Sequence, residues 1–142
     1  MSDGIRSVQP SRAEIARLLA IAARDLDQAE LKNLHLDTRF ALAYNAALQL
    51  ATVILRLHGI RVRKTAFHQR TFAELSHHVD PEFKNLAAYF DRARRKRNIL
   101  AYEQSGAASE SEVADLLKQV KQFRIWVEHE VEKRMPESGP PP

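Results

Sequence analysis

The residues best suited to chemistry lie in one dense basic segment of the chain, from Arg92 to Tyr102. It reads Arg-Ala-Arg-Arg-Lys-Arg-Asn-Ile-Leu-Ala-Tyr, so a run of cations is followed by an asparagine and, four residues later, by a tyrosine. Arginine carries a fork of donors whose geometry matches phosphate, and asparagine and tyrosine add neutral donors. These residue types at this spacing predict a binding site for an anion.

Helical spacing singles out Arg97 within the basic segment. The predicted helix has an apolar stripe formed by Phe83, Leu86, Ala87, Phe90, Ala93, Leu100 and Ala101. Steps of three and four residues place Arg97 on this stripe, at a position that the pattern reserves for the core. Asn98 and Tyr102 lie at its edge, where their polar atoms can converge with the guanidinium. We therefore predict a phosphate or nucleic-acid site made by Arg94, Arg97, Asn98 and Tyr102.

Each of these residues also has a purely structural interpretation. A buried arginine commonly pairs with a carboxylate, and a tyrosine at the edge of an apolar stripe commonly packs there. Arg92, Arg95 and Lys96 fall elsewhere on the helix and are ordinary solvent charges. The combination of Arg97, Asn98 and Tyr102 beside a cationic run favours a pocket for an anion.

Positive charge is concentrated in two segments of the chain. The sequence has 22 lysines and arginines against 18 acids, a net charge of +4. Residues 56–70 and 92–97 hold ten of these cations and no acid, which leaves 12 cations against 18 acids elsewhere. An acidic body that carries two basic segments favours an anionic partner. For residues 56–70, a solvated helix face and loop is an equally good interpretation.

The composition predicts a single all-α domain. A chain of 142 residues with 44% hydrophobic content and only four glycines fits one helical core. The absence of cysteine excludes disulfides and thiolate chemistry. The first residues lack the apolar core of a signal peptide, and polar residues interrupt the longest apolar region, 40–57. We expect a cytoplasmic protein with no membrane segment.

Periodicity predicts an antiparallel bundle of four to five helices. The helices are expected over residues 11–31, 37–57, 68–79, 80–103 and 109–134, with a basic loop at 59–67. Residues 11–134 would then form a single helical bundle domain. Residues 1–10 are expected to be a flexible N-terminus, and residues 135–142 a disordered Pro-rich tail.

Local signals mark the helix ends. Two capping boxes, in which a serine and a glutamate three residues later exchange hydrogen bonds, are predicted at Ser11 and Ser109. Asp37 and Asp80 are expected to cap the second and fourth helices, and Gly59 to end the second.

The second helix is apolar on all sides except for a narrow polar stripe. This stripe consists of Asn45, Gln49, Thr52 and Arg56, at spacings of four, three and four residues. Such a stripe faces solvent, lines a site or lies in a dimer interface, and the sequence leaves these alternatives open.

The histidines do not form a metal motif. They are scattered, and Glu74-x-x-His77 alone has metal-like spacing, whereas a di-iron bundle needs two such motifs and two further glutamates. A Gly-rich phosphate loop is also missing from the sequence. We expect no metal and no cofactor.

The Arg-Asn-x-x-x-Tyr segment from Arg97 to Tyr102, late in a bundle helix and followed by a final amphipathic helix, resembles the HEPN superfamily (higher eukaryotes and prokaryotes nucleotide-binding). The segment Phe40-Ala-Leu-Ala-Tyr-Asn-Ala-Ala-Leu-Gln-Leu-Ala is also similar to the second helix of small bacterial HEPN proteins. The resemblance spans about residues 11–134. It implies a metal-independent RNase fold, often a toxin paired with a nucleotidyltransferase-type antitoxin, whose motifs meet across a homodimer.

The resemblance assigns roles to three residues. Arg97 falls on the family arginine, which stabilises charge on the phosphate, and Asn98 falls on the polar position that follows it. Tyr102 stands where the family has the histidine that transfers protons. A tyrosine is a poor base at neutral pH because its pKa is normally near 10.

We therefore expect an RNA- or nucleotide-binding HEPN-like protein of a toxin–antitoxin or defence system, without the usual nuclease histidine, that works as a homodimer. One alternative is an active metal-independent endoribonuclease in which Tyr102, or a histidine such as His68 brought in by the fold, replaces the missing base. A second alternative is a helical scaffold or interaction module that binds its partner through the apolar second helix.

Overall fold

Five α-helices make up most of the structure, a computed structural model that describes residues 5–7, 10–102 and 106–136. The helices are α1 (Arg12–Ala29), α2 (Leu36–Leu57), α3 (Phe67–Leu75), α4 (Lys84–Tyr102) and α5 (Glu110–Arg134). A 3-10 turn, η1 (Pro81–Phe83), precedes α4, and two short strands, β1 (Ile5–Ser7) and β2 (Ile60–Val62), complete the fold. The predicted all-α bundle is confirmed.

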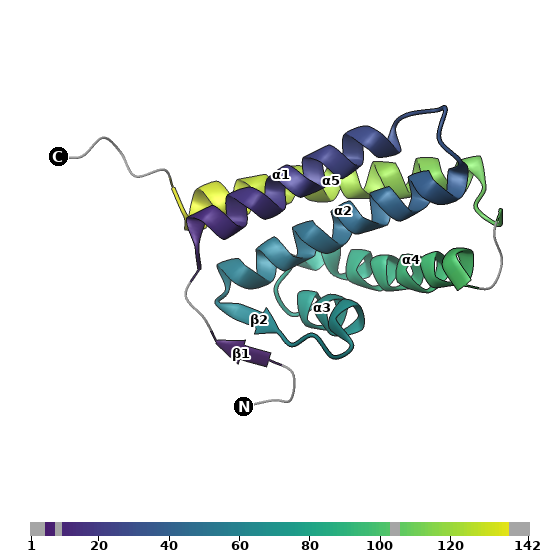
Figure 1. Cartoon of the computed structure of the whole chain (residues 1–142). Coiled ribbons are helices and arrows are strands. Elements are labelled where there is room, and N and C mark those ends of the chain that lie inside the picture. Colours follow the sequence, from purple (N-terminus) through teal and green to yellow (C-terminus); the bar gives the residue numbers. More distant parts are fainter. Residues whose placement is uncertain (1–4, 8–9, 103–105, 137–142) are drawn as a thin grey trace.

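Helix α2 is the centre of the bundle. It lies between α1 and α5 on one side and α3 and α4 on the other, and consecutive long helices run antiparallel (Figure 1). Its length and composition would suit a membrane span, but 78% of its most apolar window is buried inside the bundle. The other helices therefore cover most of the apolar surface of α2 that the sequence offers for a partner protein.

A row of aromatic rings connects four helices through the core. The ring of Tyr44 on α2 lies 5.9 Å from that of Phe72 on α3, which lies 5.9 Å from Phe90 on α4. Phe90 in turn lies 5.4 Å from Phe123 on α5. All four side chains are fully buried, so this row fixes α3 and α4 against α2.

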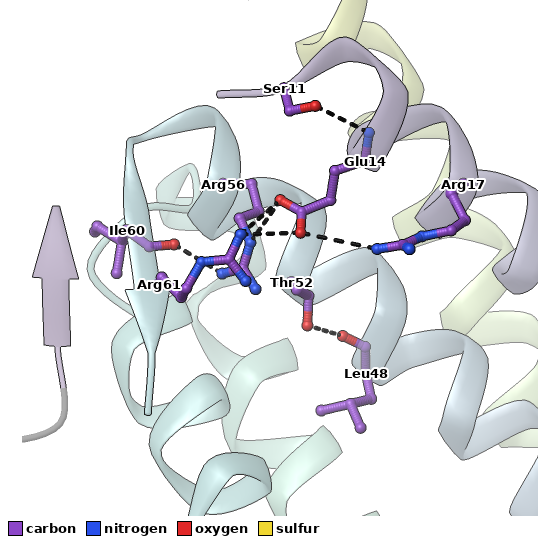
Figure 2. Close-up of polar contacts among 8 residues, drawn as sticks. All are labelled: Ser11, Glu14, Arg17, Leu48, Thr52, Arg56, Ile60 and Arg61. Atoms are coloured by element: carbon purple, nitrogen blue, oxygen red, sulfur yellow. Dashed lines mark hydrogen bonds and ion pairs between the residues drawn. The ribbon is translucent and has the colours of Figure 1, made fainter. Parts of the chain in front are cut away.

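The two predicted capping boxes have different outcomes. At α5 the box is complete: the Ser109 side chain accepts from the Glu112 amide, and the Glu112 carboxylate accepts from the Ser109 amide. At α1 the Ser11 side chain accepts from the Glu14 amide, but the Glu14 carboxylate turns to two arginines instead (Figure 2). Charged guanidiniums bind a carboxylate more strongly than a backbone amide does.

Asp37 and Asp80 do not cap their helices as predicted. Helix α2 begins one residue before Asp37, whose carboxylate accepts instead from the amides of Gly106, at 2.6 Å, and Ala108, at 3.2 Å. This contact ties the connection before α5 to the start of α2. Asp80 makes no capping hydrogen bond and accepts from Trp126 Nε1 at 3.1 Å. Gly59 does follow α2 in the left-handed conformation, with φ of 74°.

Within the N-terminus predicted to be flexible, residues 5–7 form the strand β1. β1 pairs antiparallel with β2, with Ile5 opposite Val62, and β2 occupies part of the predicted 59–67 loop. Pairing between segments so distant in the sequence leaves no local signal. In the predicted tail, the carbonyls of Met135 and Pro136 accept from Arg12 at 3.4 and 2.6 Å, and residues 137–142 lie outside the described part of the chain.

The polar stripe of α2 faces α1. The Asn45 amide donates to Asp25 of α1, and Arg56 pairs with Glu14 of α1. Between them, the Thr52 hydroxyl donates to the Leu48 carbonyl of its own helix at 2.8 Å. The stripe therefore joins the two helices inside the bundle.

Candidate functional site

A tyrosine and a histidine on neighbouring helices form a polar pair at the margin of the core. Tyr44 Oη lies 2.9 Å from Nδ1 of His68, which occupies the first turn of α3. Tyr44 is only 1% exposed, and a phenol hydroxyl that deep in a core needs a hydrogen-bond partner. His68 supplies that partner, so the imidazole is held in a fixed orientation.

Two arginines of α4 act on this pair. Burial lowers the pKa of His68, and the positive charges of Arg97 and Arg94 lower it further. Burial raises the pKa of Tyr44 well above that of an ordinary tyrosine, although the same two arginines oppose the rise. At neutral pH the imidazole is therefore uncharged and the phenol keeps its proton.

The two arginines differ in their partners. Arg94 donates through Nε to Asp91 at 2.8 Å, and Arg95 donates to the other oxygen of the same carboxylate at 2.9 Å. Arg97 is half-buried, and its guanidinium makes no hydrogen bond or ion pair with any residue that the structure describes. Among the described residues, its positive charge acts on the neutral imidazole of His68.

The predicted site residues lie elsewhere relative to the core than the sequence pattern predicts. Arg97 lies at the edge of the core, half-buried, instead of inside it. Asn98, also half-buried, follows it on α4. Tyr102, the last residue of α4, is 81% exposed, and its convergence with Arg97 stays a prediction.

The two residues whose pKa values the charge of Arg97 affects, Tyr44 and His68, come from other helices. His68 was predicted only as an alternative base, and Tyr44 was not singled out at all. The one signal for Tyr44 is its place in a nearly continuous apolar helix, where its hydroxyl must find a partner. The sequence does not show which histidine that partner is, because the two residues lie 24 positions apart.

Titratable side chains elsewhere in the bundle do not build a metal centre. Within residues 5–7, 10–102 and 106–136, no three histidines and acids are grouped in a way that could hold a metal ion. Glu74, from the one metal-like spacing, pairs with His78 at 3.2 Å and not with His77. The side chains of the site offer a cation, a neutral imidazole and a neutral phenol.

A comparison with protein families gives one match. A family model described as SAV_6107-like HEPN matches residues 29–128, which run from the end of α1 through most of α5 and include the whole Tyr44, His68 and Arg97 site. Comparisons with curated proteins and with solved structures gave no match.

Proposed function

This chain belongs to the SAV_6107-like HEPN family, and from this membership we propose that it is an RNA-binding protein whose phosphate site is centred on Arg97. The observation that carries the proposal is the half-buried guanidinium of Arg97, which has no partner in the described part of the chain and acts on the Tyr44–His68 pair. A buried or half-buried charge without a partner is costly, and a phosphate would compensate it.

The neighbouring residues fit this role. Arg94 adds a second positive charge, although Asp91 shares it. Asn98 is half-buried on the same helix and adds a neutral donor. An uncharged His68 can accept or donate a hydrogen bond to a ribose hydroxyl, which is a group that distinguishes RNA from DNA.

The test is RNA binding by the purified protein. We would measure the fluorescence anisotropy of a labelled ten-nucleotide single-stranded RNA at several salt concentrations, with Arg97→Ala beside the wild type. We expect Arg97→Ala to weaken binding about tenfold or more, since hydrogen bonds to charged groups are worth about 1.5–3 kcal/mol. The matched control is Lys118→Ala, which removes an exposed cation of α5. Equal affinity of Arg97→Ala and the wild type would refute the proposal.

A second candidate function, metal-independent endoribonuclease, is favoured by the position of His68. If Nδ1 donates its hydrogen to Tyr44 Oη, Nε2 is free to take the proton of a ribose 2′-hydroxyl. The 2′-oxygen then forms a bond to the adjacent phosphorus while the bond to the 5′-oxygen breaks, and water supplies a proton to that leaving oxygen. Arg97 would stabilise the charge that builds up on the phosphate.

Cleavage in the presence of EDTA would test this activity. The expected products are an RNA with a 2′,3′-cyclic phosphate and one with a 5′-hydroxyl, identified by mass spectrometry. His68→Gln should abolish cleavage but retain RNA binding, because it removes the base and leaves Arg97 in place. Intact RNA after long incubation with concentrated wild-type protein would rule the activity out and leave the binding function.

We further propose that the protein is a homodimer of a toxin–antitoxin or defence system with a nucleotidyltransferase-type partner. What supports this is the family resemblance, together with the large apolar side chains that remain exposed, Tyr102 and Ile125 among them. Light scattering after size-exclusion chromatography would measure the dimer. Co-expression with a nucleotidyltransferase encoded beside the gene would test the partner. A monomer in light scattering would contradict the homodimer, and failure of the two proteins to copurify would contradict the partner.

A further inference from the structure

A cationic cavity lies at the end of the bundle where α2, β2 and the start of α3 meet. Its volume is about 660 Å³, and its lining consists of Arg56, Arg61, Val62, Arg63, Lys64 and Phe67. Four of these six residues are cations and none is an acid. A cavity of this size holds a small ligand, and its charge selects an anion.

The inner wall of the cavity is a buried arginine. Arg56 is 6% exposed, and it donates through Nε to Glu14 and through Nη1 to the Ile60 carbonyl, both at 3.0 Å. These two bonds hold the guanidinium in place, as Figure 2 shows. A fixed, buried cation at the bottom of a cavity differs from the mobile lysines and arginines of an ordinary surface.

Positive charge around this wall exceeds negative charge. The single carboxylate of Glu14 is shared by Arg56, by Arg61 at 2.9 Å and by Arg17 at 3.9 Å. Although burial opposes it, the hydrogen bond from Arg61 and the charges of Arg56 and Arg61 lower the pKa of Glu14, so the carboxylate is ionised at neutral pH. Three guanidiniums around one carboxylate leave two positive charges uncompensated.

Two further cations add to the excess of positive charge around the cavity. Arg63 and Lys64 are exposed at the rim, and neither side chain makes a hydrogen bond or an ion pair with another residue in the described ranges. They follow β2 directly, and the pairing of β2 with β1 fixes the start of this segment. The cavity therefore combines a fixed cationic wall with a cationic rim.

An aromatic ring forms the side of the cavity that faces the first site. Phe67 is partly buried against the core, and its ring meets that of His68 edge to face, with centroids 6.0 Å apart. The preceding residue, Ala66, has φ of 54°, a left-handed conformation that residues with a side chain rarely adopt. This conformation directs the chain into α3 and places Phe67 between the cavity and His68.

We propose that this cavity is a second phosphate-binding site, in which Arg61, Arg63 and Lys64 hold a phosphate and Phe67 stacks against its nucleobase. Both a free nucleotide and a second nucleotide of a bound RNA strand offer this chemistry. The site is distinct from that of Arg97 and stands or falls independently of the function proposed there.

The experiment compares two probes, AMP and the labelled ten-nucleotide RNA, on the full chain. The principal variant is Arg63→Ala with Lys64→Ala, two exposed positions whose removal leaves the Glu14 cluster intact. The matched control is Lys118→Ala with Lys133→Ala, which removes two exposed cations of α5. Circular dichroism and thermal unfolding establish that all variants are folded.

We expect the principal variant to bind RNA about tenfold more weakly and to lower the slope of log Kd against log salt by about 1.4, since a single strand contributes about 0.7 per phosphate neutralised. The control should change neither value. Phe67→Leu, which keeps an apolar side chain in the core, should weaken binding about five- to tenfold without changing the salt slope, because it removes stacking alone.

The two probes identify the source of the phosphate. Loss of AMP binding in the principal variant would assign the cavity to a nucleotide, whereas loss of RNA binding alone would assign it to a strand, and both outcomes support the proposal. If the principal variant behaves as the control does with both probes, the proposal is overturned. Arg97→Ala in parallel decides the first site, so a failure of one site is distinguishable from a failure of the other.

Discussion

Tyr44 Oη lies 2.9 Å from His68 Nδ1, and through this contact the central helix sets the position of the imidazole whose pKa the charge of Arg97 lowers. The aromatic row behind Tyr44 makes the arrangement rigid, since the same ring packs on Phe72. The site is thus built from three helices, α2, α3 and α4.

Tyr44→Phe should lower the free energy of unfolding by about 1–2 kcal/mol. The substitution keeps the ring in the core but leaves His68 Nδ1 without its partner, and a lost buried hydrogen bond costs about that much. Urea denaturation measures the change. Tyr89→Phe is the matched control, because its hydroxyl donates to Asp115 at the surface, where water replaces the lost bond. An equal loss in both variants would contradict a buried Tyr44–His68 bond.

Arg97→Ala should raise the pKa of His68 toward the ordinary value. The positive charge of Arg97 disfavours the imidazolium, so its removal makes protonation easier. An NMR titration of the His68 ring proton, assigned with His68→Gln, would show the rise. Arg95→Ala is the control, since Arg95 is exposed, pairs with Asp91 and does not act on His68. A constant His68 pKa in Arg97→Ala would place the guanidinium away from the imidazole.

The protein should lose stability as the pH falls through about 6.5, before any carboxylate titrates. Burial lowers the pKa values of His58 and His68 in the folded state, so the unfolded chain takes up protons first and stability falls as the pH falls. The unfolding temperature at successive pH values measures this. In the double variant His58→Gln and His68→Gln the slope in this range should flatten, and an unchanged slope would show that these histidines are not responsible.

Glu14→Gln should destabilise the fold by about 2–3 kcal/mol. It leaves the buried Arg56 without a counter-charge, and breaking a buried ion pair costs several kcal/mol, here reduced by the partial exposure of Glu14. Urea denaturation would measure it against Glu128→Gln, whose pair with Arg124 is half-exposed and should contribute less than about 1 kcal/mol. Equal effects would mean that the cluster in Figure 2 is no stronger than a surface pair.

The same Glu14→Gln protein should bind the labelled RNA more tightly than the wild type does. The substitution removes the one acid next to the cationic cavity and increases its positive charge, whereas a purely structural cluster would show no gain. Anisotropy titrations at a temperature where the variant is fully folded would measure the difference. Weaker binding by the folded variant would count against a phosphate in this cavity.

The sequence predicts those features of the fold that depend on residues close together in the chain. The helices follow from apolar repeats, the Ser109 and Glu112 box from a spacing of three residues, and the interest of Arg97 from its phase on α4. Each of these features lies within one helix, so the regular geometry of the helix is enough to predict it.

What the sequence could not predict depends on distant segments. Tyr44 and His68 are 24 positions apart, and Glu14 and Arg56 are 42 apart, so neither pair has a periodicity that reveals it. The Glu14 prediction shows the physical reason. A carboxylate that can cap its own helix turned to guanidiniums from other elements, because the tertiary contact is the stronger interaction.

The start of α3 also fixes how close the two sites lie. Phe67 lines the cationic cavity and His68 belongs to the first site, and the centroids of these neighbouring rings are 6.0 Å apart. Successive stacked nucleotides of one strand lie about 3.4 Å apart, so about two or three nucleotides cover this distance. RNA affinity should therefore rise steeply from one nucleotide to about three, and less steeply with each nucleotide beyond.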